Sequence, residues 1–441
     1  MAGRNAGERS TEDWAELRER VATIRAGLPA VNVAQAARDV VVIASSSRGG
    51  SSIFAEVLRR SRALTHFRAE INPQLRLFGC AGGDDDSVAA DHPIPPGLGE
   101  ALGADCGQPA ARLEGQPAIH AFATEIEARL VLQWPEWLPA PGEIHADVGA
   151  TLADLGSQEG WAAGEFSDAH AFYGRLFRRF ADRWSAFNPG AYDLDRRRLS
   201  GLERLYLPGA PIEEPPFVLP LPWTHATEAE LASRPLIIKT PSNVYRLDWL
   251  RRLFPNARVR VLHLTRNAAA SINGLYDGWR FNGFHSHKID GHEVGNLAIP
   301  GYSDTIPGGD RWWKFDRPPG WRAWTAAPLE RVCAFQWASA HQAALASGGE
   351  DRFVLRFEDV LGDRSRQEAA MHALEAWLGV PVRDELTHTL QASLPLVMAT
   401  EQPRHRRWFA RAELLGPVCA EPSVKETMAA LGYPAEMEGW E

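Results

Sequence analysis

The sequence predicts an α/β fold in which helices flank a central parallel sheet. Two observations carry this prediction. First, short runs of β-branched and apolar residues, such as DVVVIA, are typical of strands buried on both faces. Second, a helical pattern follows most of these runs, and such alternation is typical of parallel strands joined by helices. The predicted strands span 39–44, 235–239, 258–264 and 352–357.

Helices are predicted where apolar residues recur at intervals of three and four. One such helix lies near the start of the sequence, with apolar positions Trp14, Leu17, Val21, Ile24 and Leu28. The other predicted helices span 51–60, 169–184, 244–254, 331–345 and 366–379, and one more begins after Arg266.

Two irregular stretches interrupt the alternation of strands and helices. Residues 77–234 contain many turn signals, and 281–328 are rich in Gly, His and Trp. We therefore expect an N-terminal helical segment at 1–38, an α/β core formed by 39–76 and 235–441, and a helical and loop insertion or cap at 77–234. Because loops on a rigid sheet usually carry specificity, we expect both insertions to form the acceptor side of the site.

Composition excludes several classes of protein. The chain has 441 residues, of which 45% are hydrophobic and 23% charged, so it can bury a full core. Its net charge of −9 argues against nucleic-acid and membrane-surface partners, which need a basic face. Its cysteines lack CxxC or metal-ligand spacing, which predicts neither a metal site nor a disulfide framework: Cys80, Cys106, Cys333 and Cys419.

The sequence also gives an expectation for localisation. The first residues are polar and lack the apolar run of a secretion signal. No later stretch approaches the ~20 apolar residues of a membrane span. We expect a cytoplasmic protein without a membrane partner; the sequence does not predict an oligomeric state.

The first candidate for chemistry is the run SSSRGGSS, 45–52, between the first predicted strand and its helix. A Gly-rich turn there exposes backbone N–H groups at a helix N-terminus, which favours a phosphate or similar anion. Ser51 and Ser52 can add hydroxyl donors, and Arg48 adds a positive charge. Ser and Gly also occur in turns that bind no ligand. The prediction of an anion site therefore rests more on the position of this run, directly after a buried strand, than on its residue types.

Basic and hydroxyl residues end two further strands. Lys239 ends one strand, and Thr265 with Arg266 ends the next. Ligands of open α/β sheets bind at the carboxyl ends of the strands, so we expect these residues and Arg48 to meet at one edge.

A nucleoside-triphosphate P-loop would contain Gly-Lys-Ser/Thr, which is absent from this sequence. The predicted order of strand, loop and helix is thus similar to that of P-loop proteins, but the phosphate-binding motif of those proteins is absent. The shorter loop suits a single 5′-phosphate with an attached group. A P-loop-type kinase remains an alternative that magnesium dependence would favour.

Several separated blocks resemble the sulfotransferase superfamily, in particular its bacterial and tyrosylprotein-sulfotransferase-like branches. SRGGSS resembles the loop that binds the 5′-phosphosulfate, and LHLTRN with its helix resembles the block that binds the 3′-phosphate. KTPSN…LFPNAR resembles the segment linking them, and FVLRFEDV a core strand. The likeness covers about half the chain. It implies transfer of a sulfuryl group from 3′-phosphoadenosine-5′-phosphosulfate to a hydroxyl, or an amine, without a metal.

The resemblance implies roles for particular residues. Arg48 and Lys239 match the cations that stabilise charge on the bridging oxygen of the donor. Glu70 nearly matches the catalytic glutamate of the tyrosylprotein-sulfotransferase-like branch, one residue out of register. His66, His285 and His287 are alternative bases, although each is more often a structural hydrogen-bonding residue.

The donor-binding residues are carried over in the same way. The loop contributes Ser47, Arg48, Gly49, Gly50, Ser51 and Ser52. Arg266 matches the arginine of the 3′-phosphate block, while Gly274 stands where the family usually has a serine, so Ser271 is the candidate hydroxyl. Arg406 or Arg407 could close over the nucleotide, although charge runs are usually solvated.

The acceptor is not identified by the sequence. We expect a small molecule, with a peptide or a carbohydrate as alternatives. The tryptophans of the second insertion could line an aromatic pocket, but core packing is the commoner role of such residues: Trp279, Trp312, Trp313 and Trp321. A non-catalytic nucleotide-binding protein of the same fold is the remaining alternative.

Overall fold

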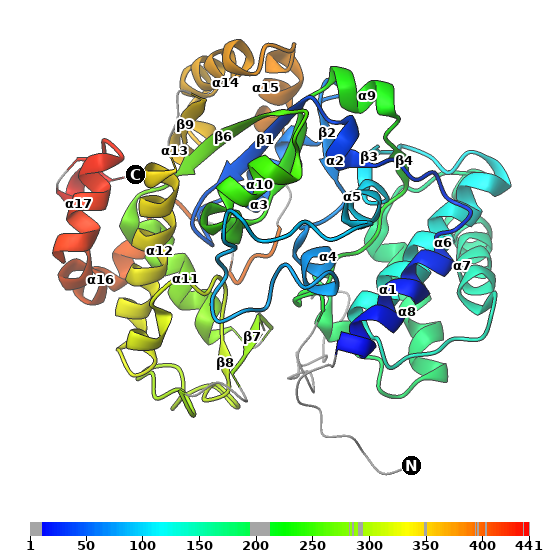
Figure 1. The fold of residues 1–441 in the computed structure, drawn as a ribbon, viewed down its shortest axis with the longest axis horizontal. Coiled ribbons are helices and arrows are strands. Elements are labelled where there is room, and N and C mark those ends of the chain that lie inside the picture. The colour runs from blue at the N-terminus through cyan, green and yellow to red at the C-terminus, as the bar shows by residue number, and fades with distance from the viewer. Residues whose placement is uncertain are drawn as a thin grey trace.

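The computed structural model describes residues 11–194, 212–281, 283–284, 286–289, 294–347, 351–392, 394, 397–401, 404–434 and 436–440. A seven-stranded sheet crosses its centre in the order β4-β3-β2-β5-β1-β6-β9 (Figure 1). The strands are β1 (Asp39–Ala44), β2 (Thr65–Phe67), β3 (Cys106–Pro109), β4 (Trp223–His225), β5 (Leu236–Lys239), β6 (Arg258–Thr265) and β9 (Arg352–Arg356). A separate pair joins β7 (His287–Lys288) to β8 (Trp312–Trp313).

The pairing directions confirm the predicted α/β class. The run β2-β5-β1-β6-β9 is parallel throughout, with β1 between β5 and β6. Antiparallel pairing occurs at one edge of this sheet, where β3 pairs with β2 on one side and with β4 on the other. All residues of β1 after Asp39 are buried, as expected for a strand covered on both faces.

Helices cover both faces of the sheet. On one face Val41 and Ile43 pack with α3 (Ser51–Leu58), α14 (Arg364–Leu378) and α15 (Arg383–Gln391). On the other face Val40 and Val42 pack with α10 (Leu247–Leu253) and α12 (Leu329–Ala346). Shorter helices join this second layer, namely α2 (Val33–Ala36), α4 (Asn72–Leu77), α5 (Leu98–Gly103) and α9 (Glu228–Ser233).

A helical cap lies beside the edge strands, at the right of Figure 1. It contains α1 (Thr11–Ile24), α6 (Gly115–Gln133), α7 (Glu143–Glu159) and α8 (Ala169–Arg183). The last three helices share an aromatic core of their own, which includes Phe172, Phe177 and Phe180 of α8. These side chains follow the helical spacing, so one face of α8 is buried.

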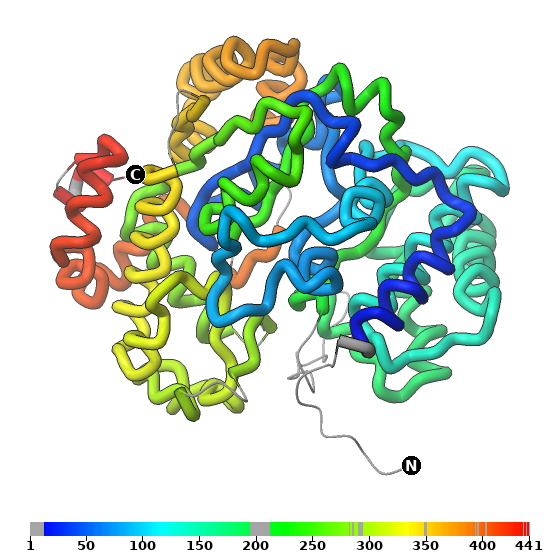
Figure 2. Tube along the Cα trace, viewed as in Figure 1, coloured from blue at the N-terminus to red at the C-terminus, as the bar shows by residue number. Residues whose placement is uncertain are grey.

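On the opposite side of the sheet, α11 (Ala268–Arg280), α16 (Ala412–Cys419) and α17 (Pro422–Ala430) pack around α12. The chain path in Figure 2 brings the red C-terminal helices beside α12. The short remaining elements are α13 (Phe357–Val360), η1 (Pro189–Ala191), η2 (Pro241–Tyr245), η3 (Trp321–Trp324), η4 (Arg407–Arg411) and η5 (Met437–Gly439).

Three strands of the main sheet were not predicted from the sequence, nor was the separate pair of β7 and β8. The insertion at 77–234 contributes β3 and β4 to the main sheet, and β2 precedes it. These strands are three or four residues long and include Gly107 and Pro109, so they lack the apolar run that revealed β1. The predicted parallel sheet is therefore extended at this edge by antiparallel pairing, which the sequence did not predict.

Buried charges link the cap to this edge of the sheet. Arg25 donates to Asp105 at 2.7 Å and to Glu125 of α6 at 2.6 Å. Arg129 pairs with Glu213 at 2.5 Å in the same buried cluster. Because unpaired charges are costly in a protein interior, removing one member of this cluster is expected to destabilise the protein.

Two features are absent from the described residues. No helix there is both long and apolar enough to cross a bilayer. Nor do three or more histidine, cysteine or acidic side chains gather there in a way that could ligate a metal ion.

Arg25→Met is expected to lower the free energy of unfolding by about 3–5 kcal/mol, because Asp105 and Glu125 would lose their nearest cation while staying buried. Urea unfolding monitored by circular dichroism measures this change. Arg175→Met is the matched control, because Arg175 pairs with Glu159 at the surface and should cost less than about 1 kcal/mol. Equal losses in the two variants would contradict the role given to the buried cluster.

Candidate active site

The loop after β1 forms the floor of the site. Arg48 and Gly50 adopt left-handed backbone conformations, with φ of 62° and 99°, and Gly49 N–H donates to Ser46 O to close a turn. The first helical hydrogen bond of α3 runs from Phe54 N–H to Gly50 O, so the preceding N–H groups have no helical partner. These free donors and the helix dipole make the start of α3 a place for an anion.

Gly50 is required here by space as well as by conformation. A Cβ atom built on it would lie 2.5 Å from the ring of Phe357, the first residue of α13. The loop therefore packs directly against the chain that follows β9.

Sheet topology brings three other strand ends to this loop. Lys239, the last residue of β5, pairs in register with Ile43 of β1. Arg266 directly follows β6, on the other side of β1, and Glu70 lies just beyond β2. Arg48, Lys239, Glu70 and Arg266 all line one cavity of about 1170 Å³. Ser47, Gly50, Ser51 and Ser52 line it too, whereas Gly49 does not.

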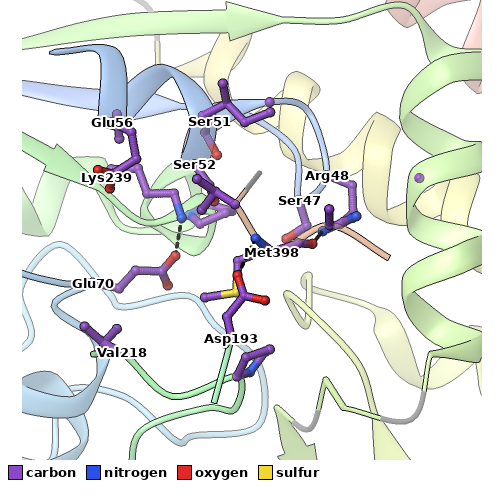
Figure 3. Close-up of a pocket in the computed structure, with 18 of the residues that line it drawn as sticks. Ser47, Arg48, Ser51, Ser52, Glu56, Glu70, Asp193, Val218, Lys239 and Met398 are labelled. Atoms are coloured by element: carbon purple, nitrogen blue, oxygen red, sulfur yellow. Dashed lines mark hydrogen bonds and ion pairs between the residues drawn. The ribbon is translucent and has the colours of Figure 1, made fainter. Parts of the chain in front are cut away.

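Lys239 and Glu70 form an ion pair within this cavity (Figure 3). Both side chains are half-buried, and in Figure 3 they point toward each other beside Ser52. A carboxylate and an ammonium group thus sit next to the anion-binding loop. The arrangement can hold an anion and accept a proton at neighbouring atoms.

Arg48 lies close to two other cations, Arg266 and Arg407. Its Nη1 donates to Met398 O at 2.7 Å, and its guanidinium lies over the ring of Phe284. Burial, followed by the charges of Arg266 and Arg407, lowers the pKa of Arg48 to about 10. Its Nε is buried without a hydrogen-bond partner among the described residues. An anion in the cavity would relieve this repulsion.

Arg266 stands beside Arg48. Its Nη1 lies 3.4 Å from Arg48 O, and its guanidinium lies over the ring of Phe357. Burial lowers the pKa of Arg266, although the Glu358 carboxylate opposes this effect. A guanidinium in this position can bind a second anionic group of the same ligand.

Gly274, which stands where the resemblance predicts a serine, has little space around it. A Cβ atom on Gly274 would lie 3.2 Å from the Cβ of Arg48, tighter than ordinary contact. Ser271 is fully buried in α11 and does not line the cavity, and its Oγ has no hydrogen-bond partner. Asn273, which does line the cavity, accepts from Arg411 at 2.6 Å. In this conformation Ser271 therefore does not present its hydroxyl to the cavity.

The basic run near the C-terminus also reaches the cavity. Arg404, Arg406 and Arg407 line it. Arg407 is paired with Asp277 and Glu401, whereas the Nε of Arg406 is buried without a hydrogen-bond partner. Arg406 is thus better placed than Arg407 to gain a new anionic partner.

The structure separates the three candidate histidines. His66 lies on β2 and lines the cavity, but burial and the charge of Arg59 lower its pKa to about 3. His287 lies on β7, 3.5 Å from Asp86, and does not line the cavity. His285 lies outside the described residues. Of the described candidate bases, only Glu70 makes a direct contact with Lys239.

Four cavity residues were not predicted from the sequence. Met398 holds Arg48 through its carbonyl and donates its N–H to Asp193 at 2.8 Å. Thr400 lies 3.4 Å from Arg48, and Asp316 accepts from Ser47. Met398 and Thr400 contact Arg48 because the C-terminal segment folds over the cavity, and no sequence motif predicts this contact. Asp316 lies within the motif GGDRWWKFDRPPGW, in which only the tryptophans stand out as candidates.

Those tryptophans are core residues. Trp279, Trp313 and Trp321 pack together behind the cavity, and Trp312 is also buried. The core prediction is confirmed. From the second insertion, Phe284, Ser286, Phe315 and Asp316 line the cavity instead.

No protein-family model matches the chain, and no curated protein matches it either. Three solved structures are similar. They are the sulfotransferase domain from the curacin biosynthetic pathway (12% identity, TM-score 0.39, covering 90% of this chain and 98% of that one), sulfotransferase STF9 from Mycobacterium avium (15%, 0.36, 96% and 85%) and sulfotransferase STF1 from Mycobacterium tuberculosis H37Rv (12%, 0.35, 93% and 84%). Similarity at this level does not establish a function, which must be inferred from the residues of this chain.

Gly50→Ala is expected to destabilise the protein more than Gly79→Ala. Both glycines have positive φ, but a Cβ atom meets Phe357 at Gly50 and nothing within 4 Å at Gly79. Backbone strain alone costs about 1–3 kcal/mol, and the clash should add about 1–3 kcal/mol at Gly50. Urea unfolding of the two variants measures the difference. Indistinguishable losses would show that the loop can move away from Phe357 at no cost.

Proposed function

We propose that the protein is a sulfotransferase that uses 3′-phosphoadenosine-5′-phosphosulfate as donor. The observation that carries the proposal is that the N-terminus of α3 and the cationic ends of β5 and β6 line one cavity. The cavity of about 1170 Å³ has room for a nucleotide and an acceptor. We expect the acceptor to present a hydroxyl, or an amine, and to be a small molecule.

The described residues suit a ligand with two separate anionic groups. The free N–H groups at the start of α3, with Arg48, would hold the 5′-phosphosulfate. Arg266 and Arg406 would hold the 3′-phosphate, because both guanidinium groups line the cavity without an ion pair to a carboxylate among the described residues. The lowered pKa of Arg48, to which the charges of Arg266 and Arg407 contribute, supports this reading, since neighbouring cations favour an anion between them.

The reaction would be an in-line displacement at sulfur. A lone pair of the acceptor oxygen forms the new S–O bond while the S–O bond to the 5′-phosphate breaks, and adenosine 3′,5′-bisphosphate leaves. Lys239 and Arg48 would stabilise the negative charge that grows on the bridging oxygen. Glu70 would take the acceptor proton, since its carboxylate lies next to Lys239 at the loop.

The ion pair between Lys239 and Glu70 would have to open when the donor binds. Without donor, the Lys239 ammonium is bound to Glu70. A donor oxygen at the loop would compete for this ammonium and leave the carboxylate free to act as a base. The proposed transfer therefore requires both residues, although only Lys239 would contact the donor.

Adenosine 3′,5′-bisphosphate is expected to raise the Tm of the protein more than adenosine 5′-phosphate or ATP with magnesium, because only the bisphosphate offers a 3′-phosphate to Arg266. Arg266→Ala should remove this difference between ligands. Arg258→Ala, at the other end of β6, is the control and should keep it. Thermal-shift titrations measure these effects. A larger shift with ATP and magnesium would favour the kinase alternative.

Lys239→Ala and Glu70→Gln are expected to fold normally and to lose transfer activity. Losing an aimed cation should lower kcat by about 10²–10³-fold, and losing the base by about 10²–10⁴-fold. The assay follows radiolabelled sulfate from the donor to a panel of phenols, alcohols, amines, sugars and tyrosyl peptides. Near-normal activity of Glu70→Gln would move the search for the base to His66 or His285. No transfer by the wild type to any acceptor would favour the non-catalytic alternative.

A further inference from the structure

Asp316 is a buried carboxylic acid that touches the anion-binding loop. It lines the cavity and is 3% exposed. Its Oδ1 accepts a hydrogen bond from Ser47, which directly precedes Arg48, and its Oδ2 lies 3.4 Å from the hydroxyl of Tyr245. A carboxylate placed beside an anion site opposes the binding of an anion, so its position requires an explanation.

The turn that carries Asp316 is held from several directions. Phe315 has φ of 61°, a strained conformation for a bulky residue. Its N–H donates to Ser286 Oγ at 3.0 Å, and its ring occupies the space where a side chain on Gly278 would lie. Backbone strain of this kind persists only where the surroundings enforce it, and it is concentrated at functional sites.

Two further bonds hold the backbone of Asp316 itself. Its carbonyl accepts from Trp313 Nε1 at 3.0 Å and from Gln336 Nε2 at 2.7 Å. Gln336 belongs to α12, a core helix. These bonds fix the backbone of Asp316, and the hydrogen bond from Ser47 holds its carboxyl group beside the loop.

The groups that face Asp316 from other elements do not neutralise it. Tyr245 on η2 has a pKa raised by burial and stays neutral. Asp86, from the segment after α4, is a second negative charge, held by the N–H of Arg317 and by His287. Among the described residues, no lysine, arginine or histidine forms an ion pair with Asp316.

The cations nearest in sequence are directed elsewhere. Lys314 donates to Phe281 O at 2.5 Å, and Arg317 donates to Gly83 O. Arg48, next to Ser47, donates to Met398 O. Burial, with a weaker contribution from Asp86, raises the pKa of Asp316 to about 7, although the Ser47 hydrogen bond opposes this rise.

We propose that Asp316 is a positioning residue for the donor loop and that it carries a proton whenever the donor occupies that loop. The inference rests on the proposed function. A protonated carboxyl still accepts the Ser47 hydrogen bond with its free oxygen, and it adds no negative charge beside the phosphosulfate. Donor binding above the pKa of Asp316 therefore takes up one proton from solution.

The test compares the wild type with Asp316→Asn, which keeps an acceptor for Ser47 and cannot ionise. The Kd of adenosine 3′,5′-bisphosphate is measured by calorimetry between pH 6 and pH 9. Relative to Asp316→Asn, the wild-type Kd should rise by about tenfold per pH unit above pH ~7, the slope of one linked proton. Ligand titration affects both proteins equally and cancels in this ratio. Parallel curves would overturn the inference but leave the proposed function intact.

Glu56→Gln is the matched control, because Glu56 of α3 also lines the cavity but pairs with Arg59, directly after that helix, and does not touch Ser47. It should keep the wild-type dependence on pH. A flattened curve in this variant as well would show a general effect of cavity charge and would overturn the specific role of Asp316. If neither wild type nor Asp316→Asn binds the nucleotide, the proposed function fails and the inference fails with it.

Two measurements keep the inference testable if Asp316→Asn folds poorly. Calorimetry of the wild type in buffers of different ionisation enthalpy gives the proton uptake directly, and zero uptake at pH 8 would overturn the inference. Ser47→Ala gives the second measurement. Since the Ser47 bond lowers the pKa of Asp316, its loss should move the break in the Kd curve to higher pH. An unmoved break would contradict the contact.

Discussion

The parallel pairing of β5, β1 and β6 is the constraint on which the rest of the site depends. Because β1 lies between the other two, the loop before α3 is flanked by Lys239 on one side and Arg266 on the other. The helix start supplies free N–H donors at the same point. Three positive side chains from distant parts of the sequence therefore share one cavity, which no single segment of the chain could achieve.

Three arginine side chains lie close together in the site, and the repulsion between their charges is unfavourable. Arg48 is half-buried near Arg266 and Arg407, and it is held by the carbonyl of Met398 and the ring of Phe284 rather than by an ion pair with a carboxylate among the described residues. Glu70 is the carboxylate paired with Lys239, and Asp316 is held by Ser47 without an ion pair to a cation among the described residues. The proposed reaction gives these two acids different tasks: Glu70 would remove a proton from the acceptor, and Asp316 would stay protonated beside the donor.

The sequence predicted the core of the fold because its strands are buried on both faces and read as apolar runs. It missed β2, β3 and β4, which are too short to show a pattern, and so it missed the antiparallel edge. Lys239 ends β5, Arg266 directly follows β6 and Arg48 lies in the loop after β1; sheet topology fixes such positions, so the sequence could place all three at one edge of the sheet. Met398 and Asp316 were not found, because their contacts depend on how two insertions and the C-terminal segment fold over the sheet. Ser271 was predicted from the resemblance as the hydroxyl that contacts the 3′-phosphate. Helix packing buries it in α11, and no sequence motif predicts that burial.

The most direct test of the proposed donor site is a crystal structure of the protein with adenosine 3′,5′-bisphosphate. We expect the 5′-phosphate at the N-terminus of α3, within hydrogen-bond distance of Lys239 or Arg48, and the 3′-phosphate on Arg266. A nucleotide bound outside this cavity, or bound with its 3′-phosphate away from Arg266, would contradict the proposed donor site.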